Sequence, residues 1–313
     1  MNFVFYFFLI PKQHSYFKFR SLPVSFFTFI CVYLEKNCNF AAYMKKYLFF
    51  AFILSLFFSV SCKSSFEKIR TSGDLRIIQK KALEYFEQGN YNNAQTLFEL
   101  IMPSLKGQPA LEEIAYKYAY THYYLRSYTS ATFYFKNFSN SYGSSPLREE
   151  AEFMAAYAQY KQSPVYRLDQ ESSIKAIDGF QSFANSFPES PRVKECNKLI
   201  DDLRKKLEKK AFEEGKLYFD ITSYQASIQV FENMLKDFPE TSDAELVRFM
   251  ILKAEYLFAE NSIYEKQAER YKLVLDKQKD LIDKFPTTRF KREMEQYTKI
   301  AKLKIASLEN VRH

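Results

Sequence analysis

The sequence predicts an all-α protein, built as a solenoid of about five helical hairpins that is closed by a carboxy-terminal capping helix. Three observations predict this class. From Asp74 onward the apolar residues follow a helical pattern, without the alternation that is typical of strands. The 313 residues include only six glycines. A step of Tyr followed by a small residue recurs, and repetition of one helical unit is the signature of a solenoid.

The first element is an export signal. The apolar run Tyr47–Val60 has 14 residues, follows Met44-Lys45-Lys46 and leads through small residues to Cys62. A basic start, a short apolar stretch and small residues before a cysteine are typical of a bacterial lipoprotein signal. The run is too short to span a bilayer core of about 30 Å as a helix. We therefore predict a cleaved signal peptide over 44–61, lipid attachment at Cys62 and a lipidated linker over 62–73.

Residues 1–43 are rich in Phe and carry few charges. We interpret them as a non-native extension from a start codon assigned too far upstream, with Met44 as the true initiator. The alternative is a membrane segment near Phe26–Leu34, although that run has only nine residues.

The net charge of +8 is concentrated before the predicted cleavage point. Six of the 45 basic residues and one of the 37 acidic residues precede Cys62, so the remainder has a net charge of +3. Nucleic-acid binding requires a concentrated basic face. We therefore expect no nucleic-acid partner.

The solenoid is predicted over 74–309. Its repeats are expected at about 74–108, 110–143, 147–188, 191–239 and 243–286, with a last helix at about 288–309. The first two fit the 34-residue tetratricopeptide (TPR) unit. The later three are longer, because they contain an insertion at Ser163–Glu171, a long helix from Arg192 to about Asp220 and an elongated connection near Glu260–Arg270.

Each turn residue has a predicted packing role. Proline ends a helix, the Ser or Thr after it caps the next one, small residues let paired helices approach, and Tyr and Phe fill the space between pairs. The predicted repeat-packing residues are Gly89, Tyr91, Ala94, Tyr128, Ala131, Phe187, Pro188, Tyr224, Phe238, Pro239, Phe285 and Pro286. A further Tyr step is Tyr224-Gln225-Ala226. Gly179 and Gly215 fall inside predicted helices and are assigned no role.

The sequence offers little for catalysis. After Cys62 it contains two histidines, His122 and His313, and no two glycines lie closer than 16 residues. A metal triad, a histidine-activated nucleophile and a phosphate-binding loop are thus poorly supported. We expect no catalytic residue, no metal and no cofactor other than the lipid on Cys62, with His122 a packed residue and Cys196 a buried apolar residue.

Two surface features have two interpretations each. The aromatic stretch Tyr116–Tyr134 forms either core between repeats, which we expect for most of it, or a surface for an extended peptide. The lysines of 205–210 form either a solvated helix face, which we favour, or a membrane-surface contact. The acidic pair Glu149-Glu150 is expected in the first turn of a helix, as a solvated surface.

The Cys62 signal, the Gly89-Asn90-Tyr91 step and the Phe-Pro endings resemble BamD, the lipoprotein family of the outer-membrane β-barrel assembly machine (BAM complex). The segments Arg167–Gln170 and Tyr256–Ser262 are similar to the long form of Bacteroidetes-type bacteria. The resemblance covers about 62–300.

The resemblance implies a non-enzymatic scaffold at the periplasmic face of the outer membrane. Its implied partners are the periplasmic domains of the barrel-forming subunit, unfolded outer-membrane proteins awaiting insertion, and the membrane through the lipid. Lys63-Ser64-Ser65, which lacks an acidic run, also favours the periplasmic face. The alternative is a generic TPR lipoprotein that coordinates peptidoglycan or division proteins. A glycan-binding lipoprotein is disfavoured because the chain has no Trp.

Overall fold

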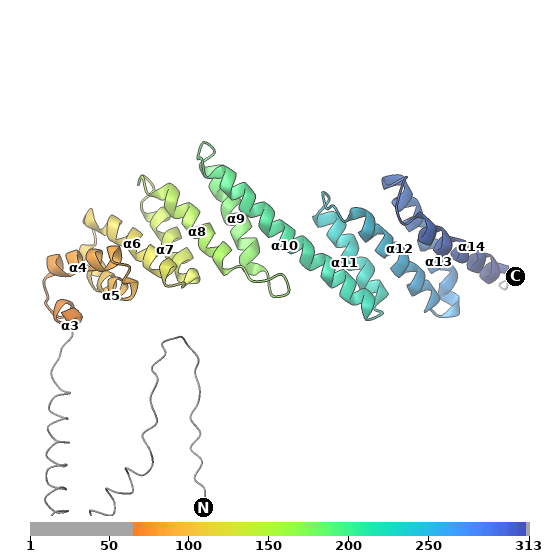
Figure 1. Cartoon of the computed structure of the whole chain (residues 1–313), viewed down its shortest axis with the longest axis horizontal. Helices are drawn as coiled ribbons and strands as arrows, with labels where there is room; N and C mark the ends of the chain where they lie inside the picture. Colours follow the sequence, from red (N-terminus) through yellow and green to blue (C-terminus); the bar gives the residue numbers. More distant parts are fainter. Residues whose placement is uncertain (1–64, 311–313) are drawn as a thin grey trace, which may run out of the picture. The chain divides into compact units, whose positions relative to one another are not determined.

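The computed structural model describes residues 65–310, and all regular elements in this part are helical (Figure 1). The predicted extension, signal peptide and lipidated Cys62 lie outside the described residues. The elements are α3 (Ser65–Arg70), α4 (Leu75–Glu87), α5 (Tyr91–Ile101), η1 (Met102–Leu105), α6 (Ala110–Tyr124), α7 (Tyr128–Ser141), α8 (Arg148–Gln162), α9 (Glu171–Ser186), α10 (Val193–Asp220), α11 (Tyr224–Asp237), α12 (Ala244–Glu260), α13 (Tyr264–Lys284) and α14 (Lys291–Asn310).

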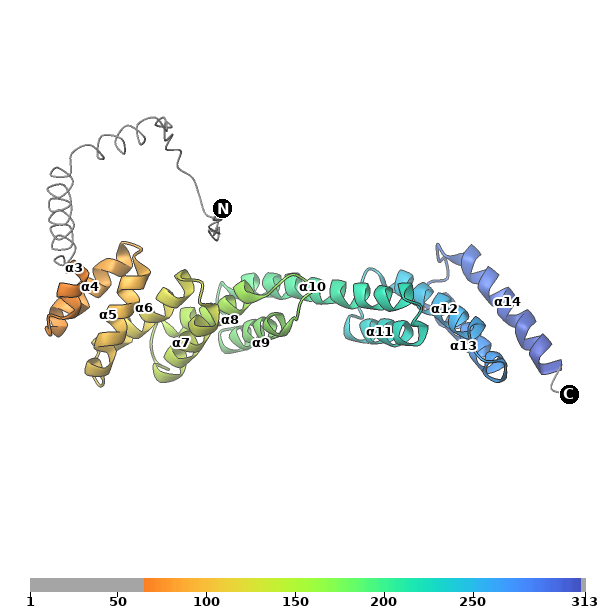
Figure 2. The same cartoon turned by 90° about the horizontal axis from the view of Figure 1, so that it is seen from below.

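Within the unit Ile69–His313, consecutive helices pair as α4/α5, α6/α7, α8/α9, α10/α11 and α12/α13 (Figure 2). Each helix packs chiefly on its neighbours in the chain, and α14 packs on both α13 and α12. Contacts restricted to sequential neighbours define a solenoid. The structure thus confirms the predicted fold class, a TPR-like stack of five hairpins with a final helix.

Three of the hairpins turn through the same backbone motif. Gly89, Arg126 and Thr222 have positive φ angles of 74°, 61° and 63°. In the last case the Ser223 N–H donates to the Tyr218 carbonyl at 2.9 Å, and the other two turns have the equivalent bond. This is the Schellman motif, in which a residue with left-handed backbone turns the chain so that the N–H groups at the turn donate to the last carbonyls of the helix. Gly89 suits that conformation, whereas Thr222 does not.

The turns between hairpins use the predicted Ser and Thr residues, but in a different way. The hydroxyls of Ser190, Thr241 and Thr288 accept from the N–H two residues later, at 3.1–3.2 Å. These bonds close a turn just outside the next helix, and where a helix cap is defined, at α10 and α12, the N-cap residue makes no side-chain cap bond. The predicted helix-capping role is therefore wrong in its geometry, although the residues do organise the turn.

The same three hydroxyls also tie each hairpin to the preceding one, by donating to a glutamate on the first helix of that hairpin. The pairs are Ser190 with Glu149 at 2.6 Å, Thr241 with Glu208, and Thr288 with Glu245 at 2.7 Å. Glu149 and Glu245 are each the second residue of their helices, α8 and α12. Glu208, in contrast, lies in the middle of α10.

The 28-residue helix α10 therefore combines two structural roles. Its first half buries Cys196, Ile200 and Leu203 in the core formed by α6–α9. Its second half contributes Phe212 and Phe219 to a separate core with α11 and α12. We infer that residues 193–206 cap the first three hairpins and that the fourth hairpin begins near Glu208, in the middle of an unbroken helix.

Two glycines lie where helices approach each other closely. A Cβ at Gly179 would lie 2.9 Å from Cβ of Ala156, and one at Gly215 would lie 2.6 Å from the Phe231 ring. Both glycines therefore have a packing role that the sequence analysis did not assign, because a partner helix occupies the space that their side chains would need. The Gly215 carbonyl also accepts from the Ser227 hydroxyl at 2.8 Å.

The prediction of an elongated connection near Glu260–Arg270 is also wrong. Only Asn261–Ile263 separates α12 from α13, and the extra residues lengthen α13, which has 21. The insertion between α8 and α9, in contrast, is a true loop over residues 163–170.

Candidate functional site: a tyrosine face around helix α6

A group of partly exposed tyrosines lies around α6 and connects three hairpins. Its members, called the tyrosine face below, are Tyr91, Tyr116, Tyr120, Tyr123, Tyr124 and Tyr157. The rings of Tyr91 and Tyr124 stack at 4.4 Å, which connects the first hairpin to the second. The rings of Tyr123 and Tyr157 lie 6.2 Å apart and connect the second to the third. Such ring pairs contribute about 0.5–1.5 kcal/mol beyond burial.

Helical spacing explains why the face forms. Tyr116, Tyr120, Tyr123 and Tyr124 are four, seven and eight residues apart along α6, and thus share one side of it. Tyr118 points to the opposite side, is buried, and donates to Glu99 at 2.6 Å.

The structure supports the expectation that most of the stretch Tyr116–Tyr134 packs as core between repeats, with two exposed exceptions. Of its eight aromatic residues, only Tyr118 is buried. Tyr124 is 45% exposed, and Phe133 on α7 is 59% exposed. The other five are partly buried and pack against the core of α6–α10, so Tyr124 and Phe133 are the clearest candidates for contact with a partner.

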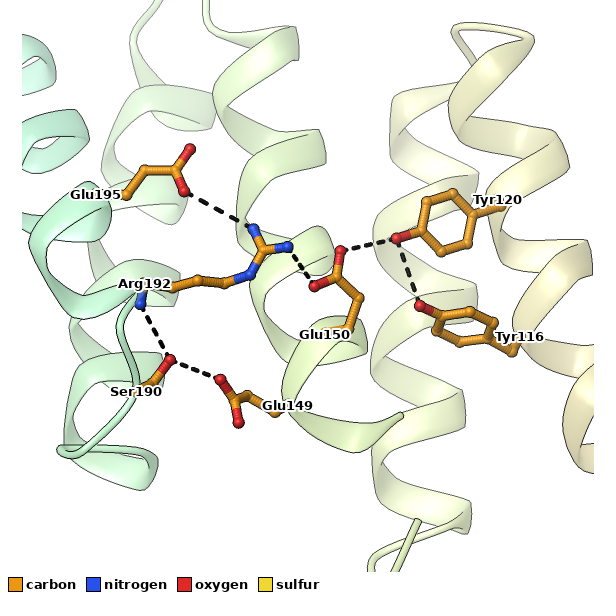
Figure 3. A network of polar contacts seen from close by, with 7 residues as sticks. All are labelled: Tyr116, Tyr120, Glu149, Glu150, Ser190, Arg192 and Glu195. Atoms are coloured by element: carbon orange, nitrogen blue, oxygen red, sulfur yellow. Dashed lines mark hydrogen bonds and ion pairs between the residues drawn. The ribbon is translucent and has the colours of Figure 1, made fainter. Parts of the chain in front are cut away.

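A polar network fixes the tyrosine face to the next two hairpins (Figure 3). The Tyr120 hydroxyl donates to Glu150 at 2.9 Å, and the Tyr116 hydroxyl lies 3.5 Å from that of Tyr120. Glu150 also pairs with the Arg192 guanidinium at 2.5 Å. That guanidinium lies 4.2 Å from the centroid of the Phe153 ring. One carboxylate thus connects α6, α8 and the start of α10.

The adjacent acid, Glu149, has a different partner. It accepts from Ser190 at 2.6 Å, and the same Ser190 oxygen accepts from the Arg192 N–H at 3.2 Å. Both acids lie in the first turn of α8, as predicted. The expectation of a simple solvated pair is nevertheless wrong for Glu150, which is partly buried and accepts from two neighbouring hairpins.

The tyrosine hydroxyls of the network have raised pKa values. Burial raises the pKa of Tyr116, and burial together with its hydrogen bonds to Tyr116 and Glu150 raises the pKa of Tyr120 above its usual range. Both hydroxyls therefore act as neutral donors at neutral pH. The face combines apolar rings, hydroxyl donors and an acidic group already paired with arginine, which suits binding better than proton transfer.

His122 lies away from this face. It is buried, its ring stacks on that of Tyr134 at 4.7 Å, and the Gln95 amide lies 3.1 Å from a ring nitrogen. Burial lowers the pKa of His122, so the ring is neutral at neutral pH. The structure confirms the prediction of a packed histidine.

The structure places the predicted repeat-packing residues in three environments. Ala94 and Ala131 are fully buried, and each lies three residues after its Tyr. At the corresponding place after Tyr224 the fully buried residue is Ser227, while Ala226 is only partly buried. Tyr91, Tyr128, Tyr224, Phe187, Phe238 and Phe285 are partly buried, and Gly89, Pro188, Pro239 and Pro286 are exposed in turns.

The sequence did not predict the ion pair of Arg192 or the hydroxyl–glutamate bonds between hairpins, which we call clamps. Arg192 was considered only as the start of a helix, because its partner Glu150 lies 42 positions earlier. A signal was nevertheless present, since a Ser or Thr follows each Phe-Pro pair by two residues, and two of the three glutamate partners, Glu149 and Glu245, lie in the first turn of a helix.

The fold defines a class of protein, a TPR-like helical-repeat scaffold. A model of the YfiO family, described as an outer membrane lipoprotein, matches residues 75–270. The chain belongs to this family of outer-membrane lipoproteins. Among the described residues, no helix is both long and apolar enough to span a membrane. In the same part of the chain, no three His, Cys, Asp or Glu side chains gather in a way that would hold a metal ion.

Other comparisons add little. A search of curated proteins found no significant match. Among solved structures, a protein of Podosopora anserina described as a kinesin light chain with nearly identical TPR-like repeats is 12% identical. The match covers 65% of this chain and 94% of that one, with a TM-score of 0.29. The fold is assigned from the observed helix pairs and not from this similarity.

Proposed function

We propose that this lipoprotein is a periplasm-facing scaffold of the β-barrel assembly machinery. In this role it binds the periplasmic domains of the barrel-forming subunit and helps to recruit unfolded outer-membrane proteins, without catalysis. Family membership supports the outer-membrane setting. The tyrosine face is the observation that carries the recruiting role, because its rings and hydroxyl donors suit segments that alternate apolar and polar residues, as membrane β-strands do.

Binding at this face is tested by replacing its most exposed ring. Tyr124→Ala removes a side chain that is 45% exposed and stacks on Tyr91. We expect about a tenfold loss of affinity for a peptide from an unfolded outer-membrane protein, as for a central aromatic contact. The matched control is Phe133→Ala on α7, a ring 59% exposed outside the tyrosine face. Equal losses in both variants would contradict this assignment.

The cellular role is tested by depletion. We expect the level of folded outer-membrane barrels to fall, and the intact protein to co-purify with a barrel-forming subunit in mild detergent. Normal barrel levels after depletion would instead favour the alternative, an envelope scaffold for peptidoglycan or division proteins.

The anchor is a separate part of the proposal. Replacing Cys62 with Ala is expected to abolish acyl labelling and to release the mature domain from the envelope fraction, provided that export still occurs. An unlabelled native protein that sediments with the envelope in the same way would contradict lipid attachment.

A further inference from the structure

The loop between α8 and α9 is held by a buried amide. Gln170 is almost inaccessible, and its side-chain N–H groups donate to the carbonyls of Val165 and Leu168 at 2.9 and 3.0 Å. Its side-chain oxygen accepts from Ser173 at 2.7 Å. With the carbonyls turned inward, the side chains of Val165 and Leu168 remain 66% and 58% exposed. The loop is thus fixed in a form that presents two aliphatic groups to solvent.

Four cations lie in this loop or next to it. Lys206 donates to Ser163 at 2.5 Å, and Lys210 donates to the Leu168 carbonyl at 2.9 Å. Lys209 lies 4.6 Å from the centroid of the Tyr166 ring, and the Arg167 Nε–H donates to the Tyr166 hydroxyl at 3.1 Å. We call the loop Ser163–Gln170, together with Lys206, Lys209 and Lys210, the basic lobe.

The basic lobe has four cations and one acid, Asp169, and is therefore net positive. The contacts of the cations are with a hydroxyl, a carbonyl and an aromatic ring, and in residues 65–310 none of them forms an ion pair with a carboxylate. Asp169 accepts from the neutral Glu171 N–H at 3.0 Å and keeps its charge, whereas Glu171 beside the loop pairs with Lys175. The lobe therefore presents a positive field around its two aliphatic side chains.

We propose that the basic lobe binds an anionic lipid surface, with Val165 and Leu168 entering the headgroup region and the cations contacting lipid phosphates. The proposal rests on the membrane location of the family and not on peptide binding by the tyrosine face. A bilayer suits the lobe better than a protein does, because two separate side chains on a protruding loop need no matching pocket in a fluid surface. Cations near such a surface bind phosphate and add attraction that salt screens.

The test uses the intact membrane-anchored protein, reconstituted into vesicles. An environment-sensitive fluorophore is attached through Leu168→Cys. Cys196 is buried, and the protein without an added cysteine supplies the background. In vesicles with phosphatidylglycerol we expect a blue-shifted emission that is quenched by nitroxide-labelled lipid. Arg167→Gln with Lys209→Gln should lower the ratio of inserted to free lobe about thirtyfold.

The matched control is the same label at Leu303 on α14, which is 64% exposed and also flanked by lysines. Equal quenching at both positions would overturn the proposal, and so would a label at 168 that stays water-exposed in anionic vesicles. Quenching that persists in pure phosphatidylcholine and ignores the charge variants would also overturn it. Protection of position 168 in cells but not in lipid vesicles would assign the lobe to a protein partner instead. None of these results depends on barrel assembly, so failure here leaves the proposed function standing.

Discussion

Glu255 of α12 is a buried acid in the carboxy-terminal part of the solenoid, with 6% of its surface exposed. Burial raises its pKa above the usual value, and the nearby carboxylate of Glu232 adds to this rise. Lys277 and Arg270 act in the opposite direction but do not cancel it. The folded protein therefore carries a cost at neutral pH, where this group is ionised against the preference of its surroundings.

The sign of the pH effect follows from this shift. Because the folded pKa is raised, the folded protein tolerates the protonated form of Glu255 better than the ionised form. The ionised form therefore costs no stability below the unfolded pKa, and its full cost is reached as pH rises through the folded pKa. We expect Glu255→Gln to raise Tm at pH 7, and the gain to vanish below pH 4.5, the ordinary pKa of the group. Thermal denaturation across this range measures it. An exposed control, Glu295→Gln, should shift Tm little at pH 7.

Single residues were predictable where only burial mattered. Cys196 is fully buried, as an apolar residue at helical spacing should be, and burial raises the pKa of its thiol to about 11. Glu150 was not predictable, because its role depends on Tyr120 and Arg192, and only the stacking of three hairpins brings these residues together. Sequence patterns report on the helix that contains a residue and not on the helix packed against it.

At the scale of elements, the hairpin turn at Thr222 carries backbone strain. A β-branched residue at a φ of 63° is unfavourable, and glycine takes this conformation freely. We expect Thr222→Gly to raise the free energy of unfolding by about 1 kcal/mol. Urea denaturation would show it as a higher midpoint at constant slope. A lower midpoint would mean that the side chain contributes more than the strain costs.

The helix contact at Gly215 predicts the opposite effect. An added methyl group would lie 2.6 Å from Phe231, a fully buried ring. We expect Gly215→Ala to destabilise the protein by about 1–3 kcal/mol, as overpacking does. The double variant with Phe231→Leu should show less than additive destabilisation in a thermodynamic cycle. Full additivity would show that the methyl group is accommodated elsewhere.

The helices themselves were well predicted, since their periodicity and Phe-Pro endings are local signals. The long α10 was expected to run from Arg192 to about Asp220, and it covers Val193–Asp220. The turns were less well predicted. The predicted caps at Ser190, Thr241 and Thr288 became clamps to a preceding glutamate, because each hydroxyl also has an acceptor on another hairpin.

For the whole molecule, stability should be local. The core formed by α6–α10 and the core around α12–α14 share no residue. In a solenoid, stability is carried by each repeat and its neighbours. We expect Tyr271→Ala, which removes a fully buried ring at a cost of about 3–5 kcal/mol, to weaken hydrogen-exchange protection in α12–α14 and to leave α6–α9 protected. Uniform loss of protection would instead indicate one cooperative unit.

The unbroken α10 also sets a rotational phase between the two parts that it joins. Each residue of an α-helix turns the chain by about 100° and advances it by about 1.5 Å. A single inserted residue between Arg204 and Lys210 would therefore swing everything downstream about a quarter-turn, while seven inserted residues would restore the original orientation to within about 20°. The number of residues in this helix, more than their identity, determines which direction the last hairpins face.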